Sequence, residues 1–201
     1  MRTGTWQQAV LGHRGDLTTI DWGFVHLIVP DRGSSRDRTG NPTDAERYLD
    51  VARRYAQTWQ QNAFDGDHYR LTFDGPGTWS LKYNLVWDRF FGFGLFRDSV
   101  VRTDLDYYST VADRYGVPLD SRAPFTKTDW LIWIAAMAQG DERSGYIDAL
   151  RRFVNETGDR TPFSDWYDTH DGREQSFHNR TVIGGIFMPL LMDGKTSGGA
   201  S

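Results

Sequence analysis

The segment 128–139 has the sequence TDWLIWIAAMAQ and indicates the fold of this chain more directly than any other segment. Every side chain from Trp130 to Ala138 is apolar, so a helix here would be apolar around its whole circumference. Such a helix is stable when neighbouring elements cover it on all sides. The run is shorter than the roughly 20 residues that a membrane-spanning helix needs. We therefore expect an inner helix of a helical protein that does not insert into a membrane.

Helical periodicity recurs on both sides of this segment, and amphipathic segments alternate with apolar ones. The alternation is typical of a double ring of helices, in which inner helices touch neighbours on all sides and outer helices face water. The expected fold is therefore mainly α, a partial α/α toroid. Besides the segment 128–139, helices are expected at about 43–63, 79–91, 98–115, 144–156 and 179–192. The helix at 179–192 is apolar, as the segment 128–139 is.

The residues between the first two expected helices have an unusual density of polar and aromatic side chains. Residues 65–74, DGDHYRLTFD, lie between turn signals at 65–66 and 75–77, which indicates a short β-hairpin-like loop near 66–76. Residues 77–88, GTWSLKYNLVWD, follow at once. A hydrophobic core does not require so many carboxylates, amides and hydroxyls, so we interpret this stretch as the wall of a polar pocket.

Two later stretches have the same character, and each delivers a tryptophan from a short polar loop. They are YGVPLDSR at 115–122, running on to TKTDW at 126–130, and PFSDWYDT at 162–169. In this order the motifs resemble the C-terminal helical domain of the glutaminase A family of fungi and bacteria, a domain similar to the six-hairpin glycosidases. The resemblance covers about 44–191. It implies an α/α toroid, hydrolase activity on glutamine, and relatives that are secreted or periplasmic.

The resemblance and the composition together divide the chain into three parts. Residues 1–41 are rich in Arg, Gly, Asp and Ser and show no helical period, although the family implies another helix pair there. A truncated gene, a shifted reading frame or a wrongly assigned start would explain this leader, and a lineage-specific extension is the alternative. Residues 42–193 form the helical domain, about half of an α/α ring. The Gly- and Ser-rich tail 194–201 is expected to be disordered.

The expected helix at 79–91 carries the first candidate catalytic residues. Ser80, Asn84 and Asp88 lie four residues apart, so on a helix they form one polar stripe. The stripe faces a central cavity in one interpretation and solvent in the other. The family resemblance favours the cavity.

Asp129 and Asp165 are the other candidate catalytic carboxylates. Asp129 begins the apolar helix, where it either caps the helix or acts in chemistry. Asp165 precedes Trp166 in a loop, where burial beside aromatic rings would raise its pKa toward that of a general acid. Hydrogen bonds to loop amides are the structural alternative. We expect Asp88, Asp129 and Asp165 to converge at one end of the ring, where a pair would divide the acid and base roles.

Two reactions are compatible with these residues. Glycosidic cleavage needs two carboxyl groups, about 5–5.5 Å apart for retention or 6.5–9.5 Å for inversion, and aromatic platforms for the sugar. Amide hydrolysis of glutamine needs a nucleophile with a base or an activated water, oxyanion donors and a cation for the substrate carboxylate. The available hydroxyls and cations are Thr78, Ser80, Ser164, Lys82, Lys127, Arg122 and Arg180.

A third interpretation is a catalytically silent helical fragment or binding module. Half a ring would leave apolar helix faces uncovered, and such faces drive self-association. If the chain is catalytic, the partner is a small-molecule or carbohydrate substrate. The side chains expected to bind it are Trp79, Ser80, Tyr83, Asn84, Trp87, Arg122, Trp166 and Arg180.

Composition argues against several other classes. The net charge of -4 is mild and charges of both signs are interspersed, so neither nucleic acid nor a membrane surface is an expected partner. The chain has no cysteine, and its five histidines show no metal-ligand spacing, so no metal and no cofactor are expected. The N-terminus shows no apolar core of a signal peptide, and the compartment stays open.

Overall fold

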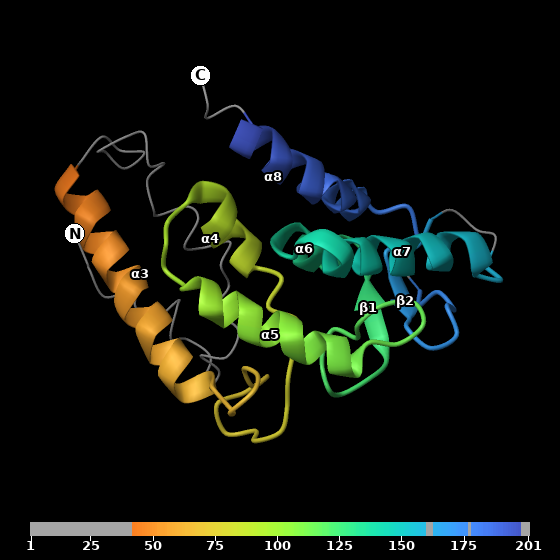
Figure 1. Cartoon of the computed structure of the whole chain (residues 1–201), viewed down its shortest axis with the longest axis horizontal. Coiled ribbons are helices and arrows are strands. Elements are labelled where there is room, and N and C mark those ends of the chain that lie inside the picture. Colours follow the sequence, from red (N-terminus) through yellow and green to blue (C-terminus); the bar gives the residue numbers. More distant parts are fainter. Residues whose placement is uncertain (1–41, 160–162, 177, 198–201) are drawn as a thin grey trace.

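The computed structural model describes residues 42–159, 163–176 and 178–197, and in this part of the chain the fold is mainly helical (Figure 1). The expected mainly α fold is confirmed. The leader 1–41 lies outside the described residues, so the expectation about it is not addressed. The helices are α3 (Pro42–Ala63), α4 (Leu85–Phe91), α5 (Asp98–Val111), α6 (Thr128–Met137), α7 (Gly140–Glu156) and α8 (Met188–Ser197), with a 3₁₀ helix, η1 (Thr181–Phe187), directly before α8.

Helix α6 is the inner helix that its sequence predicts. It contacts α4, α7, η1, α8 and the first strand, and Leu131, Ile134 and Ala135 are almost completely buried. Gly185 of η1 approaches so closely that a Cβ there would lie 2.7 Å from the Asp129 Cβ. Because apolar side chains cover the circumference of α6, neighbouring elements bury it on several sides at once. No helix among the described residues is long and apolar enough to cross a membrane.

Helices α3 and α5 are amphipathic; α3 lies at the opposite end of the molecule from α7 (Figure 1), whereas α5 contacts α7 through the ion pair of Arg102 and Glu142. Ala52, Ala56 and Trp59 of helix α3 are buried in the core. The Trp59 and Tyr69 rings stack with their centroids 4.7 Å apart. Helix α5 buries Leu105 and Tyr108 while its other face is solvated. The first helix, the third and the amphipathic α7 therefore follow the predicted pattern, although α5 ends at Val111 rather than near residue 115.

The predicted helix at 79–91 is wrong in its first half. Only α4, Leu85–Phe91, is helical, and residues 79–82 are extended. Ser80 pairs with Asp120 in an isolated antiparallel bridge, and the Leu81 amide donates to the Leu119 carbonyl at 2.7 Å. In an extended segment side chains two apart share a face, so the polar stripe of Ser80, Asn84 and Asp88 does not form.

The one sheet among the described residues was not predicted. It pairs β1 (Phe125–Lys127) with β2 (Trp166–Asp168) in antiparallel register, with Thr126 opposite Tyr167. The expected hairpin-like loop is present: Phe64 and Tyr69 form an isolated antiparallel bridge, and the Leu71 amide donates to the Thr78 carbonyl at 3.2 Å. The sheet brings the loop of Asp165 to the start of α6, because the Thr128 amide donates to the Asp165 carbonyl at 2.9 Å.

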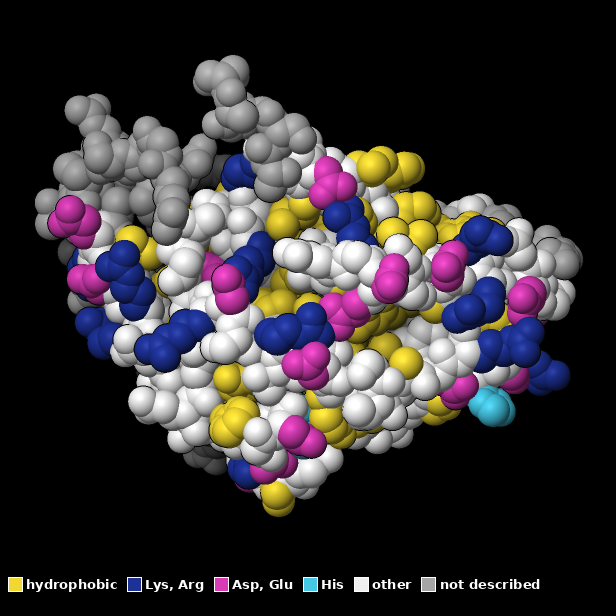
Figure 2. All heavy atoms as spheres, viewed as in Figure 1, with side chains coloured by type: hydrophobic (Ala, Val, Ile, Leu, Met, Phe, Trp, Pro, Cys, Tyr) yellow, Lys and Arg dark blue, Asp and Glu magenta, His cyan; other side chains and the backbone are white. Residues whose placement is uncertain are grey.

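The C-terminal part departs most from expectation. The predicted inner helix at 179–192 is η1 followed by α8, and α8 reaches Ser197, so residues 194–197 of the expected disordered tail are helical. Phe187, Leu190 and Leu191 are exposed, which corrects the prediction of a fully buried helix. Hydrophobic side chains reach the surface on the face that carries α8 (Figure 2). Self-association through such side chains stays a prediction.

Candidate functional site

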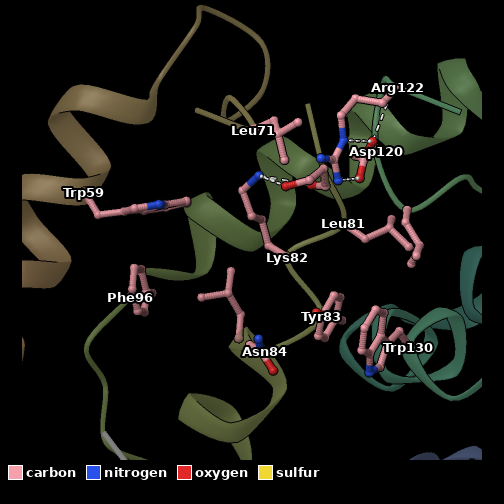
Figure 3. Close-up of a pocket in the computed structure, with 13 residues that line it drawn as sticks. Trp59, Leu71, Leu81, Lys82, Tyr83, Asn84, Phe96, Asp120, Arg122 and Trp130 are labelled. Atoms are coloured by element: carbon pink, nitrogen blue, oxygen red, sulfur yellow. Dashed lines mark hydrogen bonds and ion pairs between the residues drawn. The ribbon is translucent and has the colours of Figure 1, made fainter. Parts of the chain in front are cut away.

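A pocket of about 210 Å³ opens between α3, the extended segment before α4, the loop at 119–122 and the start of α6 (Figure 3). It combines aromatic walls with charged and hydrogen-bonding groups. The residues that line it are Trp59, Leu71, Ser80, Leu81, Lys82, Tyr83, Asn84, Leu85, Phe96, Leu119, Asp120, Arg122 and Trp130.

The extended segment 79–82 positions two pocket side chains on one face. Trp79 and Leu81 are buried, and Ser80 and Lys82, which alternate with them, share the other face and line the pocket. The segment is held at both ends, because the Ser121 amide donates to the Trp79 carbonyl at 3.0 Å and the Lys82 amide donates to the Tyr108 hydroxyl at 2.9 Å. Ser80 and Lys82 therefore lie on a fixed backbone.

The Lys82 amine lies at the centre of the pocket (Figure 3). Its Nζ is 2.7 Å from the Ser80 Oγ and 3.0 to 3.1 Å from the carbonyl oxygens of Tyr69, Arg70 and Ser80. Burial lowers the pKa of Lys82 to about 8, although the charges of Asp104 and Asp120 act in the opposite direction. The amine therefore titrates much closer to neutral pH than an ordinary lysine.

Two carboxylates influence this amine from different elements. Asp104 of α5 is buried, its Oδ1 accepts the Tyr69 amide at 2.9 Å, and burial raises its pKa to about 6. Asp120 accepts the Arg122 guanidinium at 2.7 and 2.9 Å. Burial raises the pKa of Asp120, but the Arg122 hydrogen bonds outweigh burial and the net pKa is lowered. Arg122 itself is largely exposed and presents a cation at the pocket rim.

Aromatic rings form the wall next to α6. Tyr83 and Trp130 stack in parallel with ring centroids 4.2 Å apart, and Trp59 lies across the pocket (Figure 3). The Asn84 side chain also lines the pocket and makes no capping hydrogen bond to α4. The pocket thus offers flat apolar surface beside an amide, a hydroxyl and two cations.

A second charged cluster lies at the β1–β2 pair and the start of α6. The Asp165 side chain is fully buried, and its carboxylate accepts Lys127 Nζ at 3.1 Å, Arg180 Nε at 2.9 Å and Arg180 Nη2. Burial raises the pKa of Asp165, but the hydrogen bonds from Arg180 and Lys127 outweigh it, so the net pKa is lowered. Asp165 is therefore an ionised, fully paired group.

Asp129 belongs to the same cluster but lacks such partners. Its side chain is buried, and its Oδ1 has no hydrogen-bond partner among the described residues. Burial, with the nearby charge of Asp165, raises the pKa of Asp129 to about 6. Two neighbouring carboxyls whose pKa values are pushed apart form an arrangement that suits acid and base roles.

The structure separates the predicted site residues into three groups. Ser80, Tyr83, Asn84 and Arg122 meet in the pocket, whereas Asp129, Asp165, Trp166 and Arg180 surround the second cluster. Trp79 is a core residue whose ring centroid lies 6.0 Å from that of Tyr107. Trp87 packs against Trp133 with ring centroids 5.1 Å apart. Both oxygens of the third predicted carboxylate, Asp88, accept loop amides, from Leu95 at 2.9 Å and Phe96 at 3.2 Å.

Sequence reasoning did not select Asp120 or Trp130 as site residues, and it named Lys82 only as one available cation. The spacing of Ser80 and Lys82 would have revealed the pair if the segment had been predicted as extended, since residues two apart then share a face. Among the described residues no group of three or more His, Asp or Glu side chains is arranged to hold a metal ion.

The chain is similar to known proteins of one family. The family model of the glutaminase A six helical-hairpin domain matches residues 33–190. Glutaminase A of Aspergillus oryzae (strain ATCC 42149 / RIB 40) is 37% identical over 161 residues, which cover 77% of this chain and 23% of that protein. A protein of Arthroderma benhamiae (strain ATCC MYA-4681 / CBS 112371) named "Probable glutaminase" is 27% identical over 194 residues, which cover 81% of this chain and 22% of that protein. The chain thus spans less than a quarter of either relative. No solved structure is significantly similar to it.

Proposed function

Because this chain belongs to the glutaminase A family through its six helical-hairpin domain, we propose that its pocket binds glutamine for hydrolysis of the side-chain amide. The curated relatives are named for glutaminase activity, and this chain corresponds to less than a quarter of their length. The proposal therefore concerns only the pocket of this chain and not the activity of a full-length relative.

The chemistry of the pocket carries the proposal. Glutamine offers a carboxylate, an ammonium group and a carboxamide within a few bond lengths of one another. Arg122 at the rim is a cation for the carboxylate, Asp120 is an anion within reach of an ammonium group, and Asn84 can hydrogen-bond the carboxamide. The Tyr83 and Trp130 rings supply the apolar surface along the methylene chain.

The size of the pocket favours a small substrate. Its volume is about 210 Å³, whereas sites for drug-sized ligands occupy about 300–1,000 Å³. A single amino acid suits the smaller volume better than an oligosaccharide does. The polar groups also surround the pocket on several sides, which suits a molecule that is charged at one end and carries an amide at the other.

A glycosidase-like reaction is the second candidate, and the Asp129 and Asp165 pair favours it. The pKa of Asp129 is raised to about 6 and that of Asp165 is lowered. Lys127 bonds Asp165 and also contacts two tryptophans. Its Nζ lies 5.8 Å from the ring centroid of Trp166 and 5.2 Å from that of Trp130. One carboxyl with a raised pKa beside a carboxyl with a lowered pKa, with tryptophans nearby, is the pattern of a sugar-cleaving site.

Paired assays on the purified chain separate the two candidates. Ammonia release from L-glutamine, with no turnover of a panel of aryl glycosides, supports the amide reaction. In that case Arg122→Ala raises KM for glutamine at least about tenfold, because a charged hydrogen bond contributes about 1.5–3 kcal/mol. The matched control Arg151→Ala, at an exposed position on α7, leaves KM unchanged.

The opposite outcomes are equally informative. Glycoside turnover without ammonia release would contradict the proposal and favour the carboxyl pair. A chain that binds and turns over neither substrate would favour the non-catalytic fragment.

A further inference from the structure

The sequence Ser80-Leu81-Lys82 lies in an extended segment that is paired with residues 119–121. Side chains alternate along such a segment, so Ser80 and Lys82 emerge together on one face toward the pocket, with the buried Leu81 between them. The Ser80 Oγ and the Lys82 Nζ are 2.7 Å apart. This is the hydrogen-bond reach that a nucleophile and its base require.

The number of neighbours around Lys82 bears on the direction of this hydrogen bond. Three backbone carbonyl oxygens lie 3.0 to 3.1 Å from Nζ, and the Ser80 Oγ is a fourth and closer neighbour. An ammonium group has only three N–H donors, so it cannot give each of the four neighbours a donor of its own. A neutral amine has a lone pair that accepts the Ser80 hydroxyl proton, and its two N–H groups serve two of the three carbonyls.

The charged groups around Lys82 leave its amine able to lose a proton. Among the described residues no carboxylate forms an ion pair with Lys82, whereas Lys127 is paired with Asp165. Asp104 from α5 and Asp120 from the facing loop favour the ammonium form from a distance, the Tyr108 hydroxyl is bonded to the Ser80 carbonyl, and burial outweighs these influences. With a pKa of about 8, about a tenth of Lys82 is neutral at pH 7.

We infer that Ser80 is the nucleophile of this pocket and Lys82 its general base, for substrates that carry a carboxamide. The inference rests on the proposed function for its substrate class. The geometry of the pair does not depend on that function, because it follows from the extended backbone and the 2.7 Å contact.

The reaction balances with water as the only co-substrate. The Ser80 Oγ attacks the carboxamide carbon as its proton moves to the lone pair of Lys82. The C–N bond breaks, Lys82 returns the proton to the leaving nitrogen, and ammonia departs from a Ser80 ester. Lys82 then takes a proton from a water molecule that attacks the ester. The bond between the ester carbon and the Ser80 Oγ breaks, Lys82 returns the proton to Oγ, and the acid product leaves.

Labelling with an alkyl fluorophosphonate tests the pair without requiring any natural substrate. The Ser80 Oγ forms the bond to phosphorus, fluoride leaves, and the Ser80 proton passes to Lys82. Peptide mapping by mass spectrometry is expected to find the label on Ser80 and not on Ser109, an exposed serine on α5 whose hydroxyl donates to the Asp106 carbonyl. Ser80→Ala abolishes labelling, and the control Ser109→Ala leaves it unchanged.

The pH profile of the unmodified chain distinguishes a base from a structural tether. Labelling is expected to rise with pH through a midpoint near 8, as Lys82 becomes neutral. Lys82→Arg keeps the positive charge but cannot lose a proton, so labelling falls at least about a hundredfold. If this variant melts well below the parent chain, the profile of the parent chain alone decides.

Labelling of Ser80 that is no faster than that of Ser109, or that does not change between pH 6.5 and 9.5, would overturn the inference. Rapid, pH-dependent labelling with no glutamine turnover would leave the pair intact and count against the proposed function. Glutamine turnover that survives in Ser80→Ala would overturn the pair alone.

Discussion

Lys82 and Asp165 are both charged groups held inside the molecule, and they differ in what surrounds them. Three neutral carbonyls and a hydroxyl surround the Lys82 amine, which faces an open pocket. Two cations surround the Asp165 carboxylate, which is completely buried. The lysine is left able to change its protonation state, whereas the carboxylate is fixed in its charged state. Burial alone therefore does not identify a reactive group, and the charge of the neighbours decides.

The largest expected effect is at the fully paired carboxylate. Asp165→Ala leaves Lys127 and Arg180 without their shared partner, and removing one member of a buried ion pair costs about 3–5 kcal/mol of unfolding free energy. Urea denaturation at pH 7 measures the loss. Asp50→Ala, which removes an exposed pair with Arg53, is the control and changes stability by less than about 0.5 kcal/mol. Equal effects of the two changes would contradict a structural role for Asp165.

Replacing Asp129, which lies beside Asp165, is expected to raise stability at pH 7 rather than lower it. Its folded pKa of about 6 lies above its usual value of 3.8, so the folded state binds more protons than the unfolded state between these pH values. Stability is then lost as pH rises from about 4 to 6. Asp129→Asn removes the buried charge and raises stability at pH 7 on the order of 3 kcal/mol. Unfolding free energies of both proteins at pH 4.5 and 7 measure the gain, and a destabilised variant at pH 7 would contradict the assignment.

Lys82 is expected to give the opposite pH dependence. Its folded pKa of about 8 lies below the usual 10.5, so above pH 8 the unfolded state binds more protons and stability rises with pH. Between pH 8 and 9.5, below the titration of the tyrosines, the rise is about 2 kcal/mol. Lys82→Met lacks this rise. Denaturation series in this pH range compare the two proteins, and identical slopes would show that Lys82 is solvated like a surface lysine.

The smallest expected effect is at the aromatic wall of the pocket. Tyr83→Leu removes the parallel stack on Trp130 and costs about 0.5–1.5 kcal/mol of stability beyond the lost buried area. Tyr83→Phe keeps the ring and is the matched control. Thermal melts of the three proteins measure the difference. A Tyr83→Leu melt equal to that of Tyr83→Phe would show that the stack contributes nothing.

The sequence predicts the parts of this fold that have a strong period. The all-apolar run of α6 and the amphipathic patterns of α3, α5 and α7 specify helices and their buried faces. The strands β1 and β2 have three residues each, which is too short for alternation to be recognised. Residues 79–82 directly precede α4 in the chain, but pairing with residues 119–121 holds them extended.

The same error explains how the candidate site changed. A helix would make Asn84 and Asp88 the neighbours of Ser80, whereas in the extended segment its neighbour is Lys82. Lys127, at the end of β1, bonds Asp165 from 38 positions away in the chain, and Arg180, just before η1, bonds it from 15 positions away. No local pattern in the sequence indicates such contacts.

Titration of the isotope-labelled chain with L-glutamine, followed by NMR amide shifts, tests most directly whether the pocket rather than the buried carboxyl pair receives substrate. The account predicts saturable shifts at residues 80–84, 120–122 and 130, which line the pocket. D-glucose at the same concentrations serves as the comparison ligand and leaves these amides unmoved. Shifts confined to Lys127, Asp129, Asp165 and Trp166, or none with glutamine, would contradict it.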